Sequence, residues 1–164
     1  MSIFRSVKVL IFDWGDTIMQ DFKLSGSMCD WDIVAWMPGA ETALKILAAN
    51  FTCVIATSAD HSETEEMIKA LKRVGADQYF HHFYSSKQLG FKKPDPRFFE
   101  AISTQLNINC ERCMMIGNLY EKDIVGAKSA GMQTILFDQR KQDVDFPDAD
   151  IVINSMDELV NMFR

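Results

Sequence analysis

Six short runs of apolar residues recur along the chain, and they limit how it can fold. They cover residues 7–12, 52–56, 82–84, 113–116, 134–137 and 151–153. The runs are apolar throughout and do not alternate with polar residues, which is typical of strands covered on both faces. Strands of this kind with helices between them form a parallel sheet. The predicted fold class is therefore α/β, a doubly wound three-layer sandwich with a mostly parallel central sheet.

The longer segments between these runs show the spacing of one helix face. Leu44, Leu47 and Ala48 share such a face, and Gly75 is suited to end a second helix. The predicted helices cover residues 41–50, 65–75, 97–106, 122–130 and 156–163.

The length of 164 residues, with 48% hydrophobic content, suits one compact core and is too short for two ordinary domains. We find no internal repeat, low-complexity tract or linker. The prediction is one domain over residues 1–164. Only the segment 19–37 lies outside the strand and helix pattern, as a short flap-like insertion.

The charge balance excludes some partners. The chain has 17 basic and 23 acidic residues, a formal net charge of −6, and no basic block that could neutralise a row of phosphates. We therefore expect no nucleic acid partner. No apolar run is long enough to cross a bilayer, and 7–12 is too short for a secretion signal. We expect a cytoplasmic protein that does not bind membranes.

The chain has four cysteines, Cys29, Cys53, Cys110 and Cys113, and the last two form the motif CERC. Zinc or redox use is one interpretation of that motif. It has no second ligand pair, and Cys113 opens an apolar strand. We therefore prefer buried or half-buried thiols in a reducing compartment.

Polar side chains follow four of the predicted strands. Asp13 follows the first, the stretch TSAD (57–60) follows the second, GFKKPDP lies beyond the third, and GNLYEKD (117–123) follows the fourth. In a doubly wound sheet, ligands bind beyond the carboxyl ends of the strands. Carboxylates there can hold a hard cation such as Mg²⁺, while lysine and hydroxyl groups bind phosphoryl oxygens. This set of residues indicates phosphate chemistry.

The segment around Lys93 is set up to display that side chain. Pro94 biases Lys93 away from helical backbone angles. Asp95 can cap a helix in which Pro96 takes the first position. Lys93 then lies at the mouth of this helix, and Lys92 is interpreted as a solvated neighbour.

In their order along residues 7–137, these motifs resemble those of the haloacid dehalogenase-like hydrolase superfamily. IFDWGDTI is similar to its first motif, which implies that Asp13 is the nucleophile. VIATS is similar to the second, with Thr57 as the phosphate-binding hydroxyl, and KKPDP is similar to the third, with Lys93 as its lysine. MIGNLYEKDIVGAKSAGM is similar to the fourth, which supplies a metal-binding acid. The resemblance implies a Rossmann-like fold and a Mg²⁺-dependent phosphatase acting on a small phosphorylated molecule.

The residues agree with this chemistry. Attack of the Asp13 carboxylate on phosphorus would make an acyl phosphate and divide the hydrolysis into two easier steps. The turn of Trp14, Gly15 and Asp16 can offer backbone N–H groups to the phosphate. Ser58 is as plausible a hydroxyl donor as Thr57.

The implied metal ligands are Asp13, the backbone carbonyl of Gly15, Asn118 and Asp123. Asn118 is a departure, because the family usually has an aspartate there. An amide oxygen can bind Mg²⁺ but brings no charge. We therefore expect weaker metal binding, with Asp123 taking more of the carboxylate role.

Gly15 is the second departure, because the phosphatase pattern has there an aspartate that protonates the leaving group and later activates water. Asp16 could replace it, or could be a turn residue bonded to its own backbone. His61 is another possible proton carrier, or an exposed residue beside a capping box of Ser62 and Glu65.

The segment 19–37 has room for a flap but not for a cap domain. Its large side chains Met28, Trp31, Trp36 and Met37 could cover the site or form a partner surface. We prefer a third interpretation, in which they pack on the flank of the domain itself.

The predicted function is that of a phosphatase. A carbon–halogen hydrolase is the first alternative, because dehalogenases of this superfamily also lack the second aspartate. The other alternative is a phosphate- or metal-binding protein with little turnover.

Overall fold

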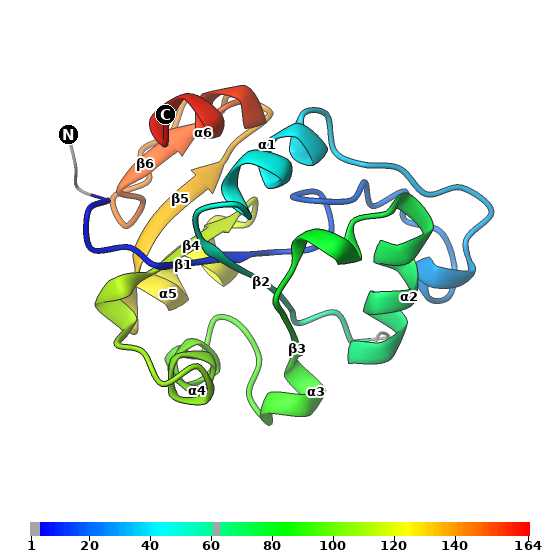
Figure 1. Cartoon of the computed structure of the whole chain (residues 1–164), viewed down its shortest axis with the longest axis horizontal. Coiled ribbons are helices and arrows are strands. Elements are labelled where there is room, and N and C mark those ends of the chain that lie inside the picture. Colours follow the sequence, from blue (N-terminus) through cyan, green and yellow to red (C-terminus); the bar gives the residue numbers. More distant parts are fainter. Residues whose placement is uncertain (1–3, 61–62) are drawn as a thin grey trace.

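The computed structural model describes residues 4–60 and 63–164. Within these ranges, six strands form one wholly parallel sheet in the order β3-β2-β1-β4-β5-β6 (Figure 1). The strands are β1 (Val9–Phe12), β2 (Thr52–Thr57), β3 (His82–Ser85), β4 (Cys113–Gly117), β5 (Gln133–Phe137) and β6 (Ile151–Ile153). Each corresponds to one of the predicted apolar runs, so the predicted α/β class is confirmed.

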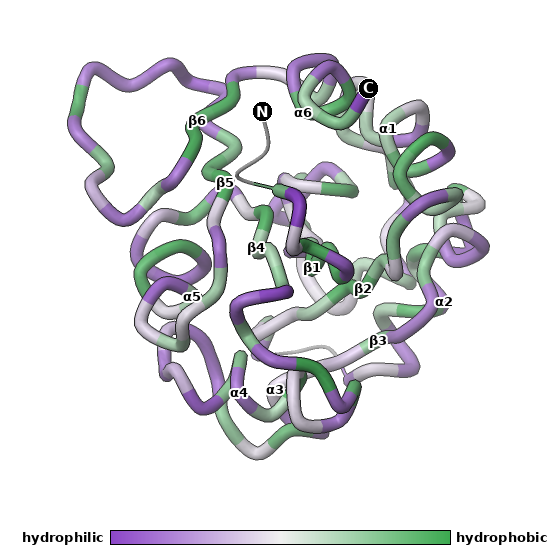
Figure 2. The backbone as a smooth tube through the Cα atoms, turned by 60° about the vertical axis from the view of Figure 1, so that its left-hand side comes forward, coloured by the Kyte–Doolittle hydropathy of each residue, from purple (hydrophilic) through white to green (hydrophobic). Residues whose placement is uncertain are grey.

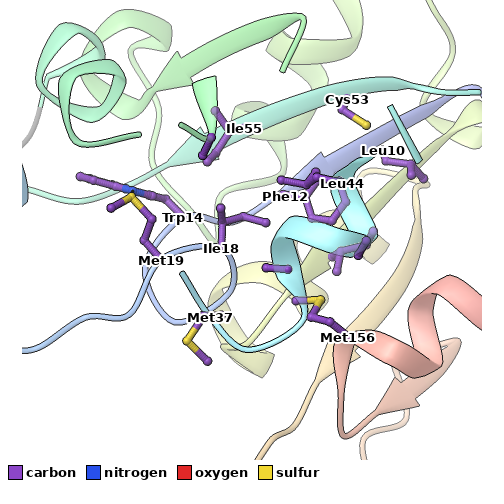
Figure 3. Close-up of a cluster of buried hydrophobic side chains, with 14 of the residues drawn as sticks. Leu10, Phe12, Trp14, Ile18, Met19, Met37, Leu44, Cys53, Ile55 and Met156 are labelled. Carbon is purple, nitrogen blue, oxygen red and sulfur yellow. The ribbon is translucent and has the colours of Figure 1, made fainter. Parts of the chain in front are cut away.

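Helices cover both faces of this sheet. Every residue of the central strand β1 is therefore buried, which is why all four are apolar. Leu10 and Phe12 join a core cluster with side chains of α1 (Ala40–Leu47), α2 (Thr64–Val74) and α6 (Met156–Met162). Val9 and Ile11 join a second cluster on the opposite face, with α4 (Pro96–Gln105) and α5 (Gly126–Ser129). Figure 3 shows the first cluster, and in Figure 2 the tube is hydrophobic along β1 and β4.

The strand register brings the ends of the central strands together. Phe12, the last residue of β1, pairs with Ile55 of β2 and Ile116 of β4. The residues that follow these strands therefore lie at one edge of the sheet, which is where the sequence places its polar motifs.

Helix ends follow the predicted signals. Gly75 caps α2 in a left-handed conformation, with its N–H donating to the carbonyls of Leu71 and Lys72. Asp95 is the N-cap of α4 and accepts from the Arg97 N–H, with proline in the first turn. The start of α2 differs from the prediction, because Glu63 is its N-cap and makes no side-chain capping bond. Ser62 of the predicted capping box lies outside the described residues.

The predicted helix at 122–130 begins earlier, as a π-helical turn (Tyr120–Val125) that leads into α5. The short helix α3 (Ser86–Leu89) was not predicted. Four residues are too few to show a helical period.

The segment 19–37 packs on the flank of the domain. Met28, Trp31 and Met37 are buried in the first core cluster. Half-buried Trp36 donates its indole N–H to the carbonyl of Val74, at the end of α2. A 3₁₀ turn (Met28–Asp30) lies against α2. The preferred interpretation of these side chains agrees with these contacts, and Met28 and Trp31 also line the cavity beside Asp13, as the alternative of covering the site predicts.

The cysteines are unpaired thiols in the structure. Cys53 and Cys113 are buried, whereas Cys29 and Cys110 are partly exposed. Burial raises the pKa of Cys53 and that of Cys113 to about 12. These two thiols therefore stay protonated and unreactive at neutral pH. In the described part of the chain, no helix is long and apolar enough to span a membrane.

Candidate active site

A cavity of about 490 Å³ opens where the central strands end. Its lining includes most of the predicted site residues, namely Asp13, Trp14, Gly15, Thr57, Ser58, Lys93 and Asp123. Residues far apart in the sequence therefore converge on one space, as the strand-end argument predicts.

Lys93 lies at the centre of the site and is only 2% exposed. Its Nζ donates to Asp13 Oδ1 at 2.7 Å, to Asp123 Oδ1 at 2.8 Å and to the Ala56 carbonyl at 3.2 Å. An ammonium group has three N–H donors, so these bonds satisfy it completely. Lys92 is exposed and pairs with Asp60, as predicted for a solvated neighbour.

Asp123 is fully buried, and both its oxygens accept hydrogen bonds. Oδ1 accepts from Lys93 Nζ, and Oδ2 accepts from the Leu119 N–H at 3.0 Å. Gly117 leaves room for this carboxylate, because a Cβ at that position would overlap it. A Cβ on Gly126 would lie 2.5 Å from the Pro94 carbonyl oxygen. Gly126 therefore lets the start of α5 approach the loop that carries Lys93.

One lysine between two aspartates leaves this buried cluster with excess negative charge. Burial raises the pKa of Asp123, and the nearby charge of Asp13 adds to that effect. Lys93 and the Leu119 N–H oppose the shift, and the resulting pKa is about 6. Burial alone would lower the pKa of Lys93, but the two carboxylates outweigh it and the pKa is raised. A cation bound nearby would relieve the repulsion between the carboxylates.

Asn118 faces the other oxygen of Asp13. The terminal amide atom on this side lies 2.8 Å from Asp13 Oδ2, 3.3 Å from the Gly15 carbonyl oxygen and 3.2 Å from Thr17 Oγ1. Without a cation, this atom is best assigned as the amide nitrogen, which donates to these oxygens. With a cation, the amide oxygen could take its place.

These distances suit a small divalent cation. In an octahedral Mg²⁺ site with ligands at about 2.0–2.1 Å, adjacent oxygens lie about 2.9 Å apart. The Asn118 amide atom therefore lies at about the spacing of neighbouring ligands from Asp13 Oδ2 and, at 3.3 Å, slightly farther from the Gly15 carbonyl oxygen. No group of three or more His, Cys, Asp or Glu side chains forms a metal site within residues 4–60 and 63–164. The ligand role of Asp123 stays a prediction.

Thr57 and Ser58 both keep a proton to donate. Thr57 Oγ1 accepts from the Ala59 N–H at 3.0 Å, and Ser58 Oγ accepts from the Lys93 N–H at 2.9 Å. Each of these bonds uses a lone pair of the hydroxyl and leaves its O–H available. Either hydroxyl could bind a phosphoryl oxygen, so both alternatives stay open.

Asp16 does not line the Asp13 cavity. Its backbone φ is 58°, its N–H donates to the Met19 carbonyl, and its Oδ1 accepts from the Asp21 N–H at 2.9 Å. Its side chain instead lines a second cavity, together with Asn118. The turn interpretation therefore describes Asp16 better than the acid or phosphate-binding one. His61 lies outside the described residues.

Two features of the site were missed in the sequence. Thr17 is fully buried, and its hydroxyl lies between Asp13 Oδ2 and Asn118. Asp21 and Lys23 line the Asp13 cavity from segment 19–37. The position of Thr17 four residues after Asp13 was the available signal for the first. The path of an irregular segment has no comparable signal.

Known proteins resemble this chain in sequence and in fold. The glyceraldehyde 3-phosphate phosphatase of Pyrococcus furiosus is 30% identical over 133 residues, which cover 78% of this chain and 54% of that protein. The chain thus spans about half the length of this curated relative. In structure, the chain resembles the HAD-hydrolase YfnB of Bacillus subtilis bound to magnesium, with a TM-score of 0.79, 17% identity and 96% and 99% of the two chains covered.

A 2-haloacid dehalogenase from Pseudomonas syringae pv. tomato has a TM-score of 0.75, with 18% identity and coverage of 96% and 98%. At this identity, the two structural matches show the fold alone. The family described as haloacid dehalogenase-like hydrolase matches residues 15–131, which is more than half of the chain. The chain therefore belongs to the haloacid dehalogenase-like hydrolases.

Proposed function

We propose that the chain is a Mg²⁺-dependent phosphatase that forms a phosphoaspartate on Asp13. The observation that carries this proposal is the Asp13 carboxylate, which lines an open cavity. One of its oxygens contacts the fully hydrogen-bonded Lys93 ammonium at 2.7 Å, and the other faces an oxygen cluster formed by Asn118, the Gly15 carbonyl and the Thr17 hydroxyl. The substrate is a small phosphorylated molecule that fits the cavity.

Two relatives support this proposal. The Pyrococcus furiosus relative carries the name of a phosphatase, and the similar Bacillus subtilis structure is bound to magnesium. Asp13, the Gly15 carbonyl and Asn118 would hold the cation. Asp123 lies nearby, hydrogen-bonded to the Lys93 ammonium that also contacts Asp13. Once bound, Mg²⁺ would neutralise charge on the phosphoryl group.

In the first step, the Asp13 carboxylate attacks phosphorus. A new oxygen–phosphorus bond forms, and the bond between phosphorus and the leaving oxygen breaks. Lys93 balances the charge at Asp13, and the hydroxyl of Thr57 or Ser58 orients a phosphoryl oxygen. No side chain at position 15 can protonate the leaving oxygen. The preferred substrates are therefore those with leaving groups that are stable as anions.

Gly15 also supports a second candidate, a carbon–halogen hydrolase, because displacement of halide needs no acid at that position. In that reaction, the Asp13 carboxylate would attack carbon and release halide. Halide release from 2-haloacids without added metal would favour this candidate over the phosphatase.

The proposal is tested with a panel of alkyl, aryl and acyl phosphates, each assayed with and without Mg²⁺. We expect Mg²⁺-dependent phosphate release by the wild type and none by Asp13→Asn. Beryllium fluoride with Mg²⁺ should bind at Asp13, with Lys93 and Thr57 or Ser58 near the fluorides. Specific affinity for phosphate and Mg²⁺ without product formation would instead indicate a binding protein.

A further inference from the structure

The space left by the missing side chain at position 15 faces another aspartate. An ideal Cβ on Gly15 would lie 3.7 Å from Asp21 Cβ and 3.9 Å from Asp21 Oδ2. Asp21 also lines the same cavity as Asp13. Asp21 therefore brings a carboxylate close to the place where the family pattern puts its second acid, but from segment 19–37.

Three hydrogen bonds fix Asp21 in this position. Its backbone N–H donates to Asp16 Oδ1 at 2.9 Å, and its Oδ1 accepts from the Lys23 N–H at 2.9 Å. Its Oδ2 pairs with Lys23 Nζ at 2.9 Å. The side chain is 29% exposed, so water can reach it. A bridge between Gly15 and Met19 holds the start of this segment beside the Asp13 turn.

The charge of Lys23 determines whether Asp21 is better suited to donate a proton or to accept one. The hydrogen bond with Asp21 raises the pKa of Lys23, so its ammonium stays charged. Lys23 Nζ pairs with Asp21 Oδ2 at 2.9 Å, so Asp21 is the anion of an ion pair. An ionised carboxylate can accept a proton but has none to donate. Asp21 is therefore suited to the step in which water is deprotonated.

We propose that Asp21 is the general base that activates water for hydrolysis of the phosphoaspartate. This inference rests on the proposed phosphatase function. The water oxygen forms a bond to phosphorus while its proton passes to the Asp21 carboxylate. The bond between phosphorus and the Asp13 oxygen breaks, which returns the Asp13 carboxylate and releases inorganic phosphate. Asp21 then loses its proton to solvent.

The test uses the full chain and an aryl phosphate with Mg²⁺, followed by rapid mixing. In Asp21→Asn, the amide oxygen can still accept from the Lys23 N–H, so the turn is kept while the base is lost. We expect the burst of phenolate release to remain. Steady-state turnover should fall by about 10²- to 10⁴-fold, the range for general acid–base catalysis. Intact mass should show phosphoenzyme accumulating.

Asp32→Asn is the matched control, because it removes the same charge from an exposed position in the same segment. Its turnover should equal that of the wild type. Gly15→Asp combined with Asp21→Asn should recover part of the lost turnover by supplying a carboxylate in the same space. Asp21→Ser replaces Asp21→Asn if the amide variant does not fold, since a hydroxyl can also accept the turn bond.

The outcomes separate the two proposals. If the wild type forms phosphoenzyme and Asp21→Asn keeps full steady-state turnover, the role of Asp21 is overturned and the phosphatase stands. If the burst and the steady state fall together without rescue by Gly15→Asp, Asp21 is structural and its role as base is also overturned. If the wild type forms no phosphoenzyme on Asp13, the proposed function fails, and the role of Asp21 fails with it.

Discussion

The two oxygens of the Asp13 carboxylate have different surroundings. Oδ1 contacts the buried ammonium of Lys93, whose three donors are all used. Oδ2 contacts the neutral groups of Thr17 and Asn118, whose amide can present either its nitrogen or its oxygen. The lysine side is complete without a ligand, whereas the amide side can rearrange around a cation. Charge balance and the proposed metal binding are thus separated on two sides of one side chain.

Asp13→Asn removes the proposed nucleophile between these two sides and should have the largest effect. We expect turnover of phosphate esters to fall on the order of 10⁶-fold, the scale on which loss of a covalent nucleophile acts. The neutral amide fills the same space, so the circular dichroism spectrum should be unchanged. Hydrolysis at the wild-type rate in the purified variant would rule out the mechanism.

Lys93→Gln removes the ammonium group that contacts Asp13 Oδ1. It leaves two buried carboxylates without their cation, and the loss of one partner of a buried ion pair typically costs about 3–5 kcal/mol. We expect the free energy of unfolding, measured in urea, to fall by about that amount, and turnover to fall with it. Lys92→Gln is the matched control, and this exposed substitution should change stability by less than about 0.5 kcal/mol. Equal effects of the two substitutions would mean that Lys93 is not the central charge.

The choice of substrate and substitutions at Gly15 test whether the cavity lacks an acid for the leaving group. Because position 15 offers no acid to the leaving group, we expect kcat/KM for aryl phosphates to exceed that for alkyl phosphates by about 10²- to 10⁴-fold. Gly15→Asp should narrow this ratio, whereas Gly15→Asn should not. Gly15 does not have a positive φ, and a Cβ there would meet Asp21 Cβ and Oδ2 at the ordinary contact distances of 3.7 and 3.9 Å, so the backbone accepts a Cβ at this position. Similar wild-type values for both substrate types would show that another acid serves the first step.

Asn118→Asp changes the amide side and should have the smallest effect. A carboxylate in place of the amide adds a charge to the oxygen cluster, so Mg²⁺ should bind more tightly, by about tenfold, which is about 1.4 kcal/mol. Without Mg²⁺, the same substitution should lower the melting temperature, because two carboxylates then face each other. Titration calorimetry showing equal or weaker Mg²⁺ affinity would place Asn118 outside the metal site.

The sequence was most informative where the backbone is regular. Strands buried on both faces appear as uninterrupted apolar runs, so all six were predicted, and their shared edge brought Asp13, Lys93 and Asp123 together. Asp95 and Gly75 marked helix ends through local backbone bonding. Asp21 could not be predicted in this way, because its position depends on the path of an irregular segment and not on a period.

Gly117 and Gly126 give the site a requirement that its chemistry alone would not reveal. Neither glycine has a side chain that could take part in a reaction, yet a Cβ at one would overlap Asp123, and a Cβ at the other would press on the carbonyl next to Lys93. The distance between Asp123 and Lys93 therefore depends on the lack of a side chain at Gly117 and at Gly126. At either glycine, a substitution that changes neither charge nor polarity would still displace the ion pair of Lys93 and Asp123. The substitution tolerance of the site is set as much by steric clearance as by its reactive groups.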